Sequence, residues 1–277
     1  MSTVLVSHLD DVGCSYGSVT AMVELARIGS VTCGSIMVPT AWFPHVAASA
    51  TPDLDLGIHI TLTSESEAFR WRPLSTSDPA SGLLDDYGYM WPRVPALRRH
   101  ADPNAVESEM RAQIDTALAA GIDITHLDHH MGAALAPEFV DHTLRVASDY
   151  GIPILFPSDI AGYLAVLELG AVDLEALQRA RERAVAADLA FGDNFVMPLF
   201  HKTEPDLEAT FHRELDSLPS GVTYLSLHCS APGDIEQVHP HSAHWRIGEY
   251  RLFGSEGFGR WLRDQTGELV GTRQLRR

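Results

Sequence analysis

Apolar positions along the chain alternate between two kinds of pattern. Short runs rich in Val, Ile and Leu predict buried strands, and stretches with apolar residues every three or four positions predict helices. The expected strands are Thr3–Ser7, Val31–Val38, Leu56–Leu62, Ile124–Asp128, Ile154–Phe156, Phe195–Leu199, Val222–Leu227 and, closing the sheet, Glu268–Thr272. The expected helices are Ser18–Arg27, Pro103–Ala120, Pro137–Tyr150, Asp173–Ala190, Glu204–Leu218, Ala243–Phe253 and Glu256–Thr266.

This alternation of strand and helix continues over the whole chain. It predicts parallel strands joined by crossover helices. Seven or eight such repeats favour a closed or nearly closed TIM-like (β/α) barrel, seven-stranded or irregular, over an open sheet. Neither a linker nor an internal repeat is visible, so residues 1–277 are expected to form a single α/β domain. In such a barrel the active site lies at the C-terminal ends of the strands.

One segment, residues 63–102, is too long for an ordinary connection. It is rich in Trp, Pro, Ser and Gly, and its aromatic residues Trp71, Tyr87, Tyr89 and Trp91 are unusual in disordered chains. Long ordered loops on such scaffolds usually cover the active site. We therefore expect an ordered loop over the active face, with a partly disordered insertion as the alternative.

Charge and composition exclude several classes of protein. The chain carries 20 Lys and Arg against 37 Asp and Glu, a net charge of −17 without a long basic run, which argues against nucleic-acid binding. The sequence contains neither an apolar run of about 20 residues nor a basic signal-peptide start, so membrane insertion and secretion are not expected. Three cysteines without CxxC spacing argue against disulfides or a zinc knot and favour a cytoplasmic location.

The 14 histidines become informative through their placement among the acidic residues. Asp10 and Asp11 follow the first expected strand, and His59 lies in the third. The sequence Asp128-His129-His130 follows the fourth strand, and His228 follows the seventh. Because the C-terminal ends of parallel strands meet on one face, we expect these residues to share one pocket.

Each of these residues also has an ordinary structural interpretation. Asp10 and Asp11 could supply a metal ligand and a general base, or could simply form a turn. His59 could be a ligand or a hydrogen-bonded core histidine. The dense segment 126–130 would be costly to bury without a role, and imidazoles with one carboxylate suit a divalent ion such as Zn²⁺.

Two further histidine positions carry less information. His228 could protonate a leaving group if it reaches the same face as the other residues. A cluster of three histidines is expected to lie in a solvated loop: His239, His241 and His244.

Five motifs in this order resemble the YdjC-like carbohydrate deacetylases, which are related to polysaccharide deacetylases. They are His8-Leu-Asp-Asp-Val-Gly13, Ser35-Ile-Met-Val38, Gly57-Ile-His-Ile-Thr-Leu-Thr63, Thr125-His-Leu-Asp-His-His130 and Tyr224-Leu-Ser-Leu-His228. The closing Gly267-Glu-Leu-Val-Gly-Thr-Arg-Gln-Leu275 also looks like the last strand of that family. The resemblance runs almost from end to end and is weakest at residues 162–191.

The resemblance implies a TIM-like barrel that binds one divalent metal ion, Zn²⁺ or Mg²⁺. It implies that Asp11, His59 and His130 are metal ligands, that Asp10 is the general base and that His228 is the general acid. It further implies a small carbohydrate substrate and a homodimer, although no interface is readable in the sequence.

The chain departs from the family pattern at four positions. Val12 replaces a common Phe, His129 stands where Ser is usual, Gly132 stands where another His often occurs, and Cys229 replaces a usual Pro. None of these changes removes an expected ligand. They bear on substrate identity more than on chemistry, and His129 is an additional imidazole that could contact metal or substrate.

These features predict a metal-dependent hydrolase that removes an acetyl group from an N-acetylated sugar. Another metal-dependent amide, ester or phosphoester hydrolase is the first alternative, although the site motifs contain no Arg or Lys for phosphate. A non-catalytic barrel is the second, and catalysis by Cys14 or Cys229 is a weak third. Three aromatic residues are candidates for sugar stacking, with core packing as the alternative: Trp42, Trp71 and Trp91.

Overall fold

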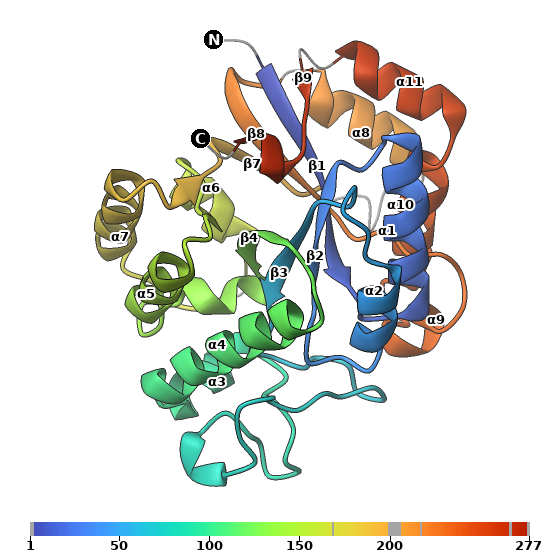
Figure 1. Cartoon of the computed structure of the whole chain (residues 1–277). Helices are drawn as coiled ribbons and strands as arrows, with labels where there is room; N and C mark the ends of the chain where they lie inside the picture. The colour runs from blue at the N-terminus through green and yellow to red at the C-terminus, as the bar shows by residue number, and fades with distance from the viewer. Residues whose placement is uncertain (1–2, 168, 199–205, 217, 266–267, 276–277) are drawn as a thin grey trace.

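A parallel β-sheet wrapped by helices forms the body of the protein (Figure 1). The structure is a computed structural model, and it describes residues 3–167, 169–198, 206–216, 218–265 and 268–275. The strands are β1 Thr3–Val12, β2 Cys33–Ile36, β3 Leu56–Ile60, β4 Ile124–His129, β5 Ile154–Leu155, β6 Ala190–Phe191, β7 Asn194–Val196, β8 Gly221–Leu227 and β9 Glu268–Leu269.

The sheet closes on itself through one bent segment. Its hydrogen-bonded order is β6-β5-β4-β3-β2-β1-β8-β7, so β6 and β7 stand at its two ends. These two strands are consecutive in the chain and are separated only by Gly192 and Asp193. The segment 190–196 thus pairs with β5 through β6 and with β8 through β7. When this segment is counted as one strand, seven described strands surround the TIM-like barrel. The α/β barrel prediction is confirmed.

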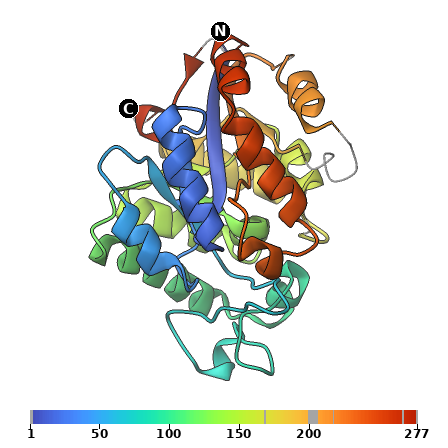
Figure 2. The same cartoon turned by 90° about the vertical axis from the view of Figure 1, so that its right-hand side faces the viewer.

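Helices cover the outside of this barrel (Figures 1 and 2). The longer ones are α1 Tyr16–Ile28, α4 Pro103–Ala119, α5 Val140–Tyr150, α7 Leu174–Ala186, α8 Leu207–Leu215, α10 Ala243–Phe253 and α11 Glu256–Gln265. The shorter ones are α2 Phe43–Ser49, α3 Val94–His100, α6 Ile160–Ala165 and α9 Ile235–Val238, with 3₁₀ turns at Pro79–Ser81, His130–Leu135 and Thr272–Leu275. In both views α1 and α10 lie side by side outside β1.

Alternation along β1 divides its side chains between two environments. Leu5 and Leu9 pack in the main apolar core between sheet and helices. Val6 belongs to a second apolar cluster with Leu155 of β5 and Tyr224 of β8. This arrangement follows from the two-residue period of a strand.

Several expected elements differ from those observed. β1 does not end at Ser7 but runs to Val12, so Asp10 and Asp11 lie within the strand. The helix expected to reach Ala190 ends at Ala186, because Asp188 has a left-handed φ of 56° and the chain then enters β6. The last strand pairs only with β1 and does not close the sheet. Three residues that bound expected elements lie outside the described residues: Leu199, Glu204 and Thr266.

A bulge in β1 places its two acidic residues. The pairing with β2 advances three residues on β1, from Leu9 to Val12, against two on β2. Within this irregularity Asp11 has a φ of 60°, a left-handed conformation that Asp tolerates better than most residues. In an extended strand consecutive side chains point to opposite faces, whereas the bulge allows both Asp10 and Asp11 to face the same cavity.

The long segment after β3 is ordered and lies at the lower end of the barrel in Figure 1. It contains Pro79–Ser81, α3 and an isolated antiparallel bridge between Leu84 and Met90. Its buried Trp71 donates an indole N–H to the carbonyl of Thr63. The segment thus contains regular structure and a buried aromatic side chain, and the expectation that it covers the active face stays a prediction.

Two composition-based expectations can be compared with the structure. All three cysteines, Cys14, Cys33 and Cys229, are free and buried, as expected for a chain without a disulfide framework. Among the described residues, none of the helices combines the length and the apolar character needed to cross a bilayer.

The loop after β8 packs closely on the first turn of α1. A Cβ at Gly17 would lie 2.2 Å from the carbonyl oxygen of Ala231. Because backbone must move to make room, Gly17→Ala is expected to lower the free energy of unfolding by about 1–3 kcal/mol, measured by denaturant titration. The control is Gly257→Ala, where the added Cβ meets no atom within 4 Å. Equal stability of the two variants would contradict this packing constraint.

Candidate active site

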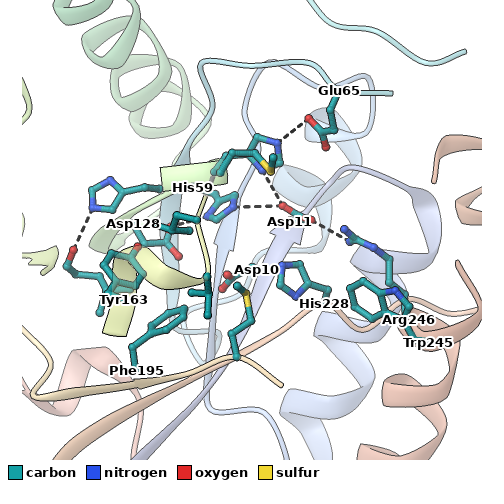
Figure 3. Close-up of a pocket in the computed structure, with 17 residues that line it drawn as sticks. Asp10, Asp11, His59, Glu65, Asp128, Tyr163, Phe195, His228, Trp245 and Arg246 are labelled. Carbon is teal, nitrogen blue, oxygen red and sulfur yellow. Dashed lines mark hydrogen bonds and ion pairs between the residues drawn. The ribbon is translucent and has the colours of Figure 1, made fainter. Parts of the chain in front are cut away.

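A cavity of about 210 Å³ opens at the C-terminal ends of the strands. Its polar wall includes every residue expected from the sequence to act as ligand, base or acid: Asp10, Asp11, His59, His130 and His228. Figure 3 shows Asp11 between His59 and Arg246, with Asp10 and His228 to one side of this row. The structure therefore brings all five residues together.

Asp11 is the centre of the polar wall. One carboxylate oxygen, Oδ1, lies 3.2 Å from Nε2 of His59 and 3.0 Å from Nδ1 of His130. The other oxygen, Oδ2, accepts a hydrogen bond from Arg246 Nη1 at 2.9 Å. All four side chains are at least nine-tenths buried.

Two further carboxylates orient the imidazoles. His59 Nδ1–H donates to Asp128 Oδ1 at 2.8 Å, and His130 Nε2–H donates to Glu65 Oε2 at 2.9 Å. In the neutral rings, the nitrogens that face Asp11 then carry lone pairs. Carboxylate partners of this kind commonly fix the tautomer of metal-binding histidines.

The resulting cluster of three acceptor atoms fits a divalent ion. Asp11 Oδ1, His59 Nε2 and His130 Nδ1 all lie within 4.8 Å of one another. Ligand atoms on tetrahedral bonds of about 2.0–2.1 Å are separated by about 3.3 Å, close to the two O···N distances seen. Two imidazoles and one carboxylate favour Zn²⁺ or another transition ion over Mg²⁺, which prefers oxygen ligands.

Without a metal ion, the imidazoles of His59 and His130 bind protons more tightly than usual. Burial lowers the pKa of His130, but Glu65 and Asp11 outweigh burial and raise it to about 9. Burial also lowers the pKa of His59, but Asp128 and Asp11 outweigh burial and raise this pKa well above the usual range. A metal ion must displace these protons, since only neutral imidazoles bind metal.

Asp10, the expected base, lies beside the cluster around Asp11. Its carboxylate accepts hydrogen bonds from Ser226 Oγ at 2.7 Å and from His8 Nδ1 at 2.6 Å. One of its oxygens lies within 4.8 Å of a His59 nitrogen, so it is adjacent to the candidate metal-binding cluster.

His228 lies next to Asp10 across the β1–β8 pair. The register pairs Leu9 with Leu227, so Asp10 and His228 are the next residues on the two strands. The His228 backbone N–H donates to buried Glu249 at 2.7 Å, and its ring packs edge-to-face on Trp245. Burial lowers the pKa of His228 to about 4, so the ring is neutral at neutral pH.

Sequence reasoning missed two site residues and the role of a third. Glu65 comes from the long segment, and Arg246 comes from α10. Both Arg246 and Glu249 interrupt the buried face of that helix, and charged residues on a buried face commonly have partners. That pattern was the available signal for Arg246, whereas nothing in the sequence distinguishes Glu65. Asp128 belonged to the expected cluster, but its role in orienting His59 was not foreseen.

The structure shows the surroundings of three of the four departures from the family pattern. His129 donates Nε2–H to the carbonyl of Leu155 at 3.0 Å and does not belong to the cluster around Asp11. Gly132 has a φ of 71°, and a Cβ there would lie 2.5 Å from Leu167 Cδ1, so Leu167 occupies the space a larger residue would need. Cys229 is buried in the core.

Cysteine catalysis is not supported by the environments of the thiols. Burial raises the pKa of Cys14 to about 12, and burial likewise raises that of Cys229. Neither thiol would form the reactive thiolate at neutral pH.

The three tryptophans considered for sugar stacking do not line the cavity. Trp42 packs against Tyr16 and His45, whereas the indole N–H of Trp91 is bonded to Gly82. Trp245, which had not been considered, does line the cavity.

The three histidines expected in a solvated loop lie in different environments. His241 and His244 are exposed, but His239 is mostly buried, with its Nε2 3.7 Å from a Glu65 oxygen. The prediction of a solvated position was therefore wrong for His239.

Comparison with known proteins places the chain in a family. The family model described as YdjC-like protein matches residues 4–264. The chain belongs to the YdjC-like family. A relative from Thermus thermophilus named carbohydrate deacetylase is 34% identical over 229 residues, 83% of this chain and 78% of that protein. Another carbohydrate deacetylase, from Brevibacillus brevis, is 33% identical over 161 residues, 55% of this chain and 59% of that protein.

A solved structure supports the fold of this YdjC-like chain. It is described as a putative cellobiose-phosphate cleavage protein from Enterococcus faecalis, and it superposes over 100% of both chains with a TM-score of 0.80. At 18% sequence identity this likeness concerns the fold alone.

Replacement of one imidazole tests the metal-binding cluster. His59→Ala removes a ligand atom and leaves Asp11 and His130 unable to hold the ion, so bound metal should fall from about one ion per chain to a trace. Elemental analysis after metal reconstitution measures this. The exposed His244→Ala is the control and should keep its metal. Full occupancy in His59→Ala would remove His59 from the ligand set.

The raised pKa of Glu249 predicts that the free energy of unfolding depends on pH. Burial raises its pKa to about 8 from an ordinary 4.5. Below about pH 4.5 both folded and unfolded chains are protonated. As the pH rises toward 8, the unfolded chain ionises freely and the folded chain does not, so the free energy of unfolding falls, by up to about 1.4 kcal/mol per pH unit.

Glu249→Gln should remove this decline between about pH 5 and pH 8 while keeping an acceptor for the His228 N–H. Urea unfolding at several pH values tests this, with the exposed Glu236→Gln as control. Parallel pH curves for wild type and Glu249→Gln would contradict the buried, protonated state.

Proposed function

We propose that this chain is a metal-dependent hydrolase that removes the acetyl group from an N-acetylated sugar or oligosaccharide. One observation carries the proposal: Asp11, His59 and His130 present three converging acceptor atoms, with both imidazoles oriented by carboxylates. Relatives named carbohydrate deacetylase support the reaction class.

The divalent ion would be held by Asp11 Oδ1, His59 Nε2 and His130 Nδ1. When bound, it would polarise the amide carbonyl and make an attacking water more acidic. The donor atoms favour Zn²⁺ over Mg²⁺, as argued above.

Asp10 is assigned the role of general base. Its carboxylate faces the cavity and is held by Ser226 and His8, so it can take the proton of a water that attacks the acetyl carbon. The C–N bond then breaks, and the products are acetate and the free amino sugar.

His228 is assigned the role of general acid toward the departing amine. Since its pKa of about 4 leaves it neutral at neutral pH, it must gain a proton during the reaction. The proton that Asp10 takes from the attacking water passes on to His228, which gives it to the amine nitrogen as the C–N bond breaks. Both His228 and Asp10 line the same cavity, which supports this transfer.

One observation bears on the phosphoesterase alternative. The site motifs lack Arg and Lys, but the fold brings Arg246 into the cavity wall. Its Nη1 is bonded to Asp11 Oδ2, and that bond uses one of its donors on the protein itself. We therefore favour amide hydrolysis. A homodimer and a cytoplasmic location stay predictions.

A substrate panel tests the proposal directly. Acetate release is expected from at least one N-acetylated mono- or oligosaccharide, with activity lost on chelation and restored by Zn²⁺. Sugar phosphates measured by phosphate release are expected to be inert. Phosphate release without acetate release would overturn the proposal in favour of a phosphoesterase, and absence of bound metal after reconstitution would favour a non-catalytic barrel.

Asp10→Asn tests the base. The substitution keeps the shape of the side chain but removes its ability to accept a proton, so kcat should fall by about 10²–10⁴-fold with bound metal unchanged. The exposed Asp53→Asn is the matched control and should behave as wild type. Wild-type kcat in Asp10→Asn would rule out this role.

A further inference from the structure

Behind Asp10, two buried histidines meet inside the barrel. His8 Nδ1–H donates to Asp10 Oδ1 at 2.6 Å. On the other side of the same ring, His8 Nε2 lies 2.8 Å from Nε2 of His126, and one proton is shared between these nitrogens. Both rings are fully buried. The interiors of such barrels are usually filled by branched apolar side chains, so this pair requires an explanation.

The line of polar groups continues from His126 to the opposite end of the barrel. His126 Nδ1 lies 2.9 Å from the hydroxyl of Thr125 and 2.8 Å from that of Thr272. Both hydroxyls also contact Asp55 Oδ1, at 2.5 Å and 2.8 Å. Asp55 directly precedes β3, and its second oxygen accepts the backbone N–H of Arg273 at 2.7 Å.

The backbone at Gly57 leaves room for the ring of His126. A Cβ at Gly57 would lie 2.5 Å from the ring of His126, so only glycine leaves the ring its place. Both nitrogens of His8 and both nitrogens of His126 have polar partners within 3 Å. A buried polar network of this kind is costly when partly satisfied and confers rigidity when complete.

The network supplies the hydrogen-bond donor to one of the two carboxylate oxygens of Asp10. Ser226 holds Oδ2, and His8 holds Oδ1. Tyr224 lies 3.3 Å from Oδ1, but its hydroxyl has the shorter contact to Asp128, at 2.7 Å, and has only one proton to give. Without the His8 donor, the Asp10 carboxylate would be free to turn about its Cβ–Cγ bond.

We propose that His8 is a positioning residue, which aims the Asp10 carboxylate at the reacting centre and is itself held by the line His126–Thr125/Thr272–Asp55. The inference rests on the proposed role of Asp10 as base. The physical reason is that a reacting group displaced by about 1 Å can cost about 10²-fold in rate.

Two substitutions of His8 separate its two hydrogen bonds. In His8→Asn the amide nitrogen takes the place of Nδ1, so the bond to Asp10 is kept and that to His126 is lost. In His8→Gln the amide reaches the place of Nε2, so the contact with His126 is kept and the donor to Asp10 is lost.

The measurements are kcat, KM, bound metal and the crystal structure of each variant. For His8→Gln we expect kcat to fall about 10–100-fold with KM and bound metal unchanged, and the Asp10 carboxylate to rotate. His8→Asn should restore kcat to within about 3-fold of wild type, with Asp10 in place. Thermal unfolding verifies that both variants fold.

Other outcomes overturn the inference. Wild-type kcat in His8→Gln, or an unmoved Asp10 carboxylate in its structure, would show that His8 does not position Asp10. Equal losses of kcat and metal in both variants would show a purely structural role. If wild type releases acetate from none of the sugars, the proposed function fails, while the position of Asp10 in the two variants still decides the inference.

Discussion

The left-handed backbone of Asp11 is the constraint on which the site depends. A single extra residue in β1 turns this carboxylate toward the same cavity as Asp10. Its Oδ1 then meets two imidazoles, and its Oδ2 meets a guanidinium from the far end of the chain. A residue in this conformation costs of order 1–3 kcal/mol, and the surrounding contacts hold it there.

The charges around Asp11 favour a bound cation. Asp11, Asp128 and Glu65 surround two imidazoles that are neutral when they act as ligands. Arg246 offsets one of these three negative charges. In a site removed from water, the remaining charge is a strong attraction for a divalent ion or, in its absence, for protons on the rings. The raised pKa values of His59 and His130 express this attraction.

Much of the site could be predicted because parallel strands place their ends together. His59 and His130 are found at such ends from periodicity alone. The register that pairs His59 with Asp128 is seen only in the structure, because the β3–β4 pairing contains an irregularity between Leu56 and Ile58. The contributions of Glu65 and Arg246 could not be predicted, since a long segment and a helix face approach the site through tertiary packing. The bulge at Asp11 has no sequence signal that separates it from an ordinary strand end.

The fold likewise contains elements that the sequence predicts and elements that it does not. Long periodic elements such as α4 were expected with nearly the observed bounds, because capping and periodicity agree locally. The two-residue β6 was not, because its first residue, Ala190, falls at the end of a stretch whose pattern predicts a helix. The closure of the barrel by residues 190–196 depends on which neighbours they find in space, and the local sequence does not encode this.

The pairing of β1 with β8 also bears on how the protein is made. The three residues of the candidate metal-binding cluster precede β8 and α10 in the chain by about ninety residues or more, so they are synthesised first. On the ribosome, the cation-attracting cluster therefore emerges well before His228 and Arg246. A nascent chain that captures its ion at this stage would have the first four strands pinned together before the barrel can close.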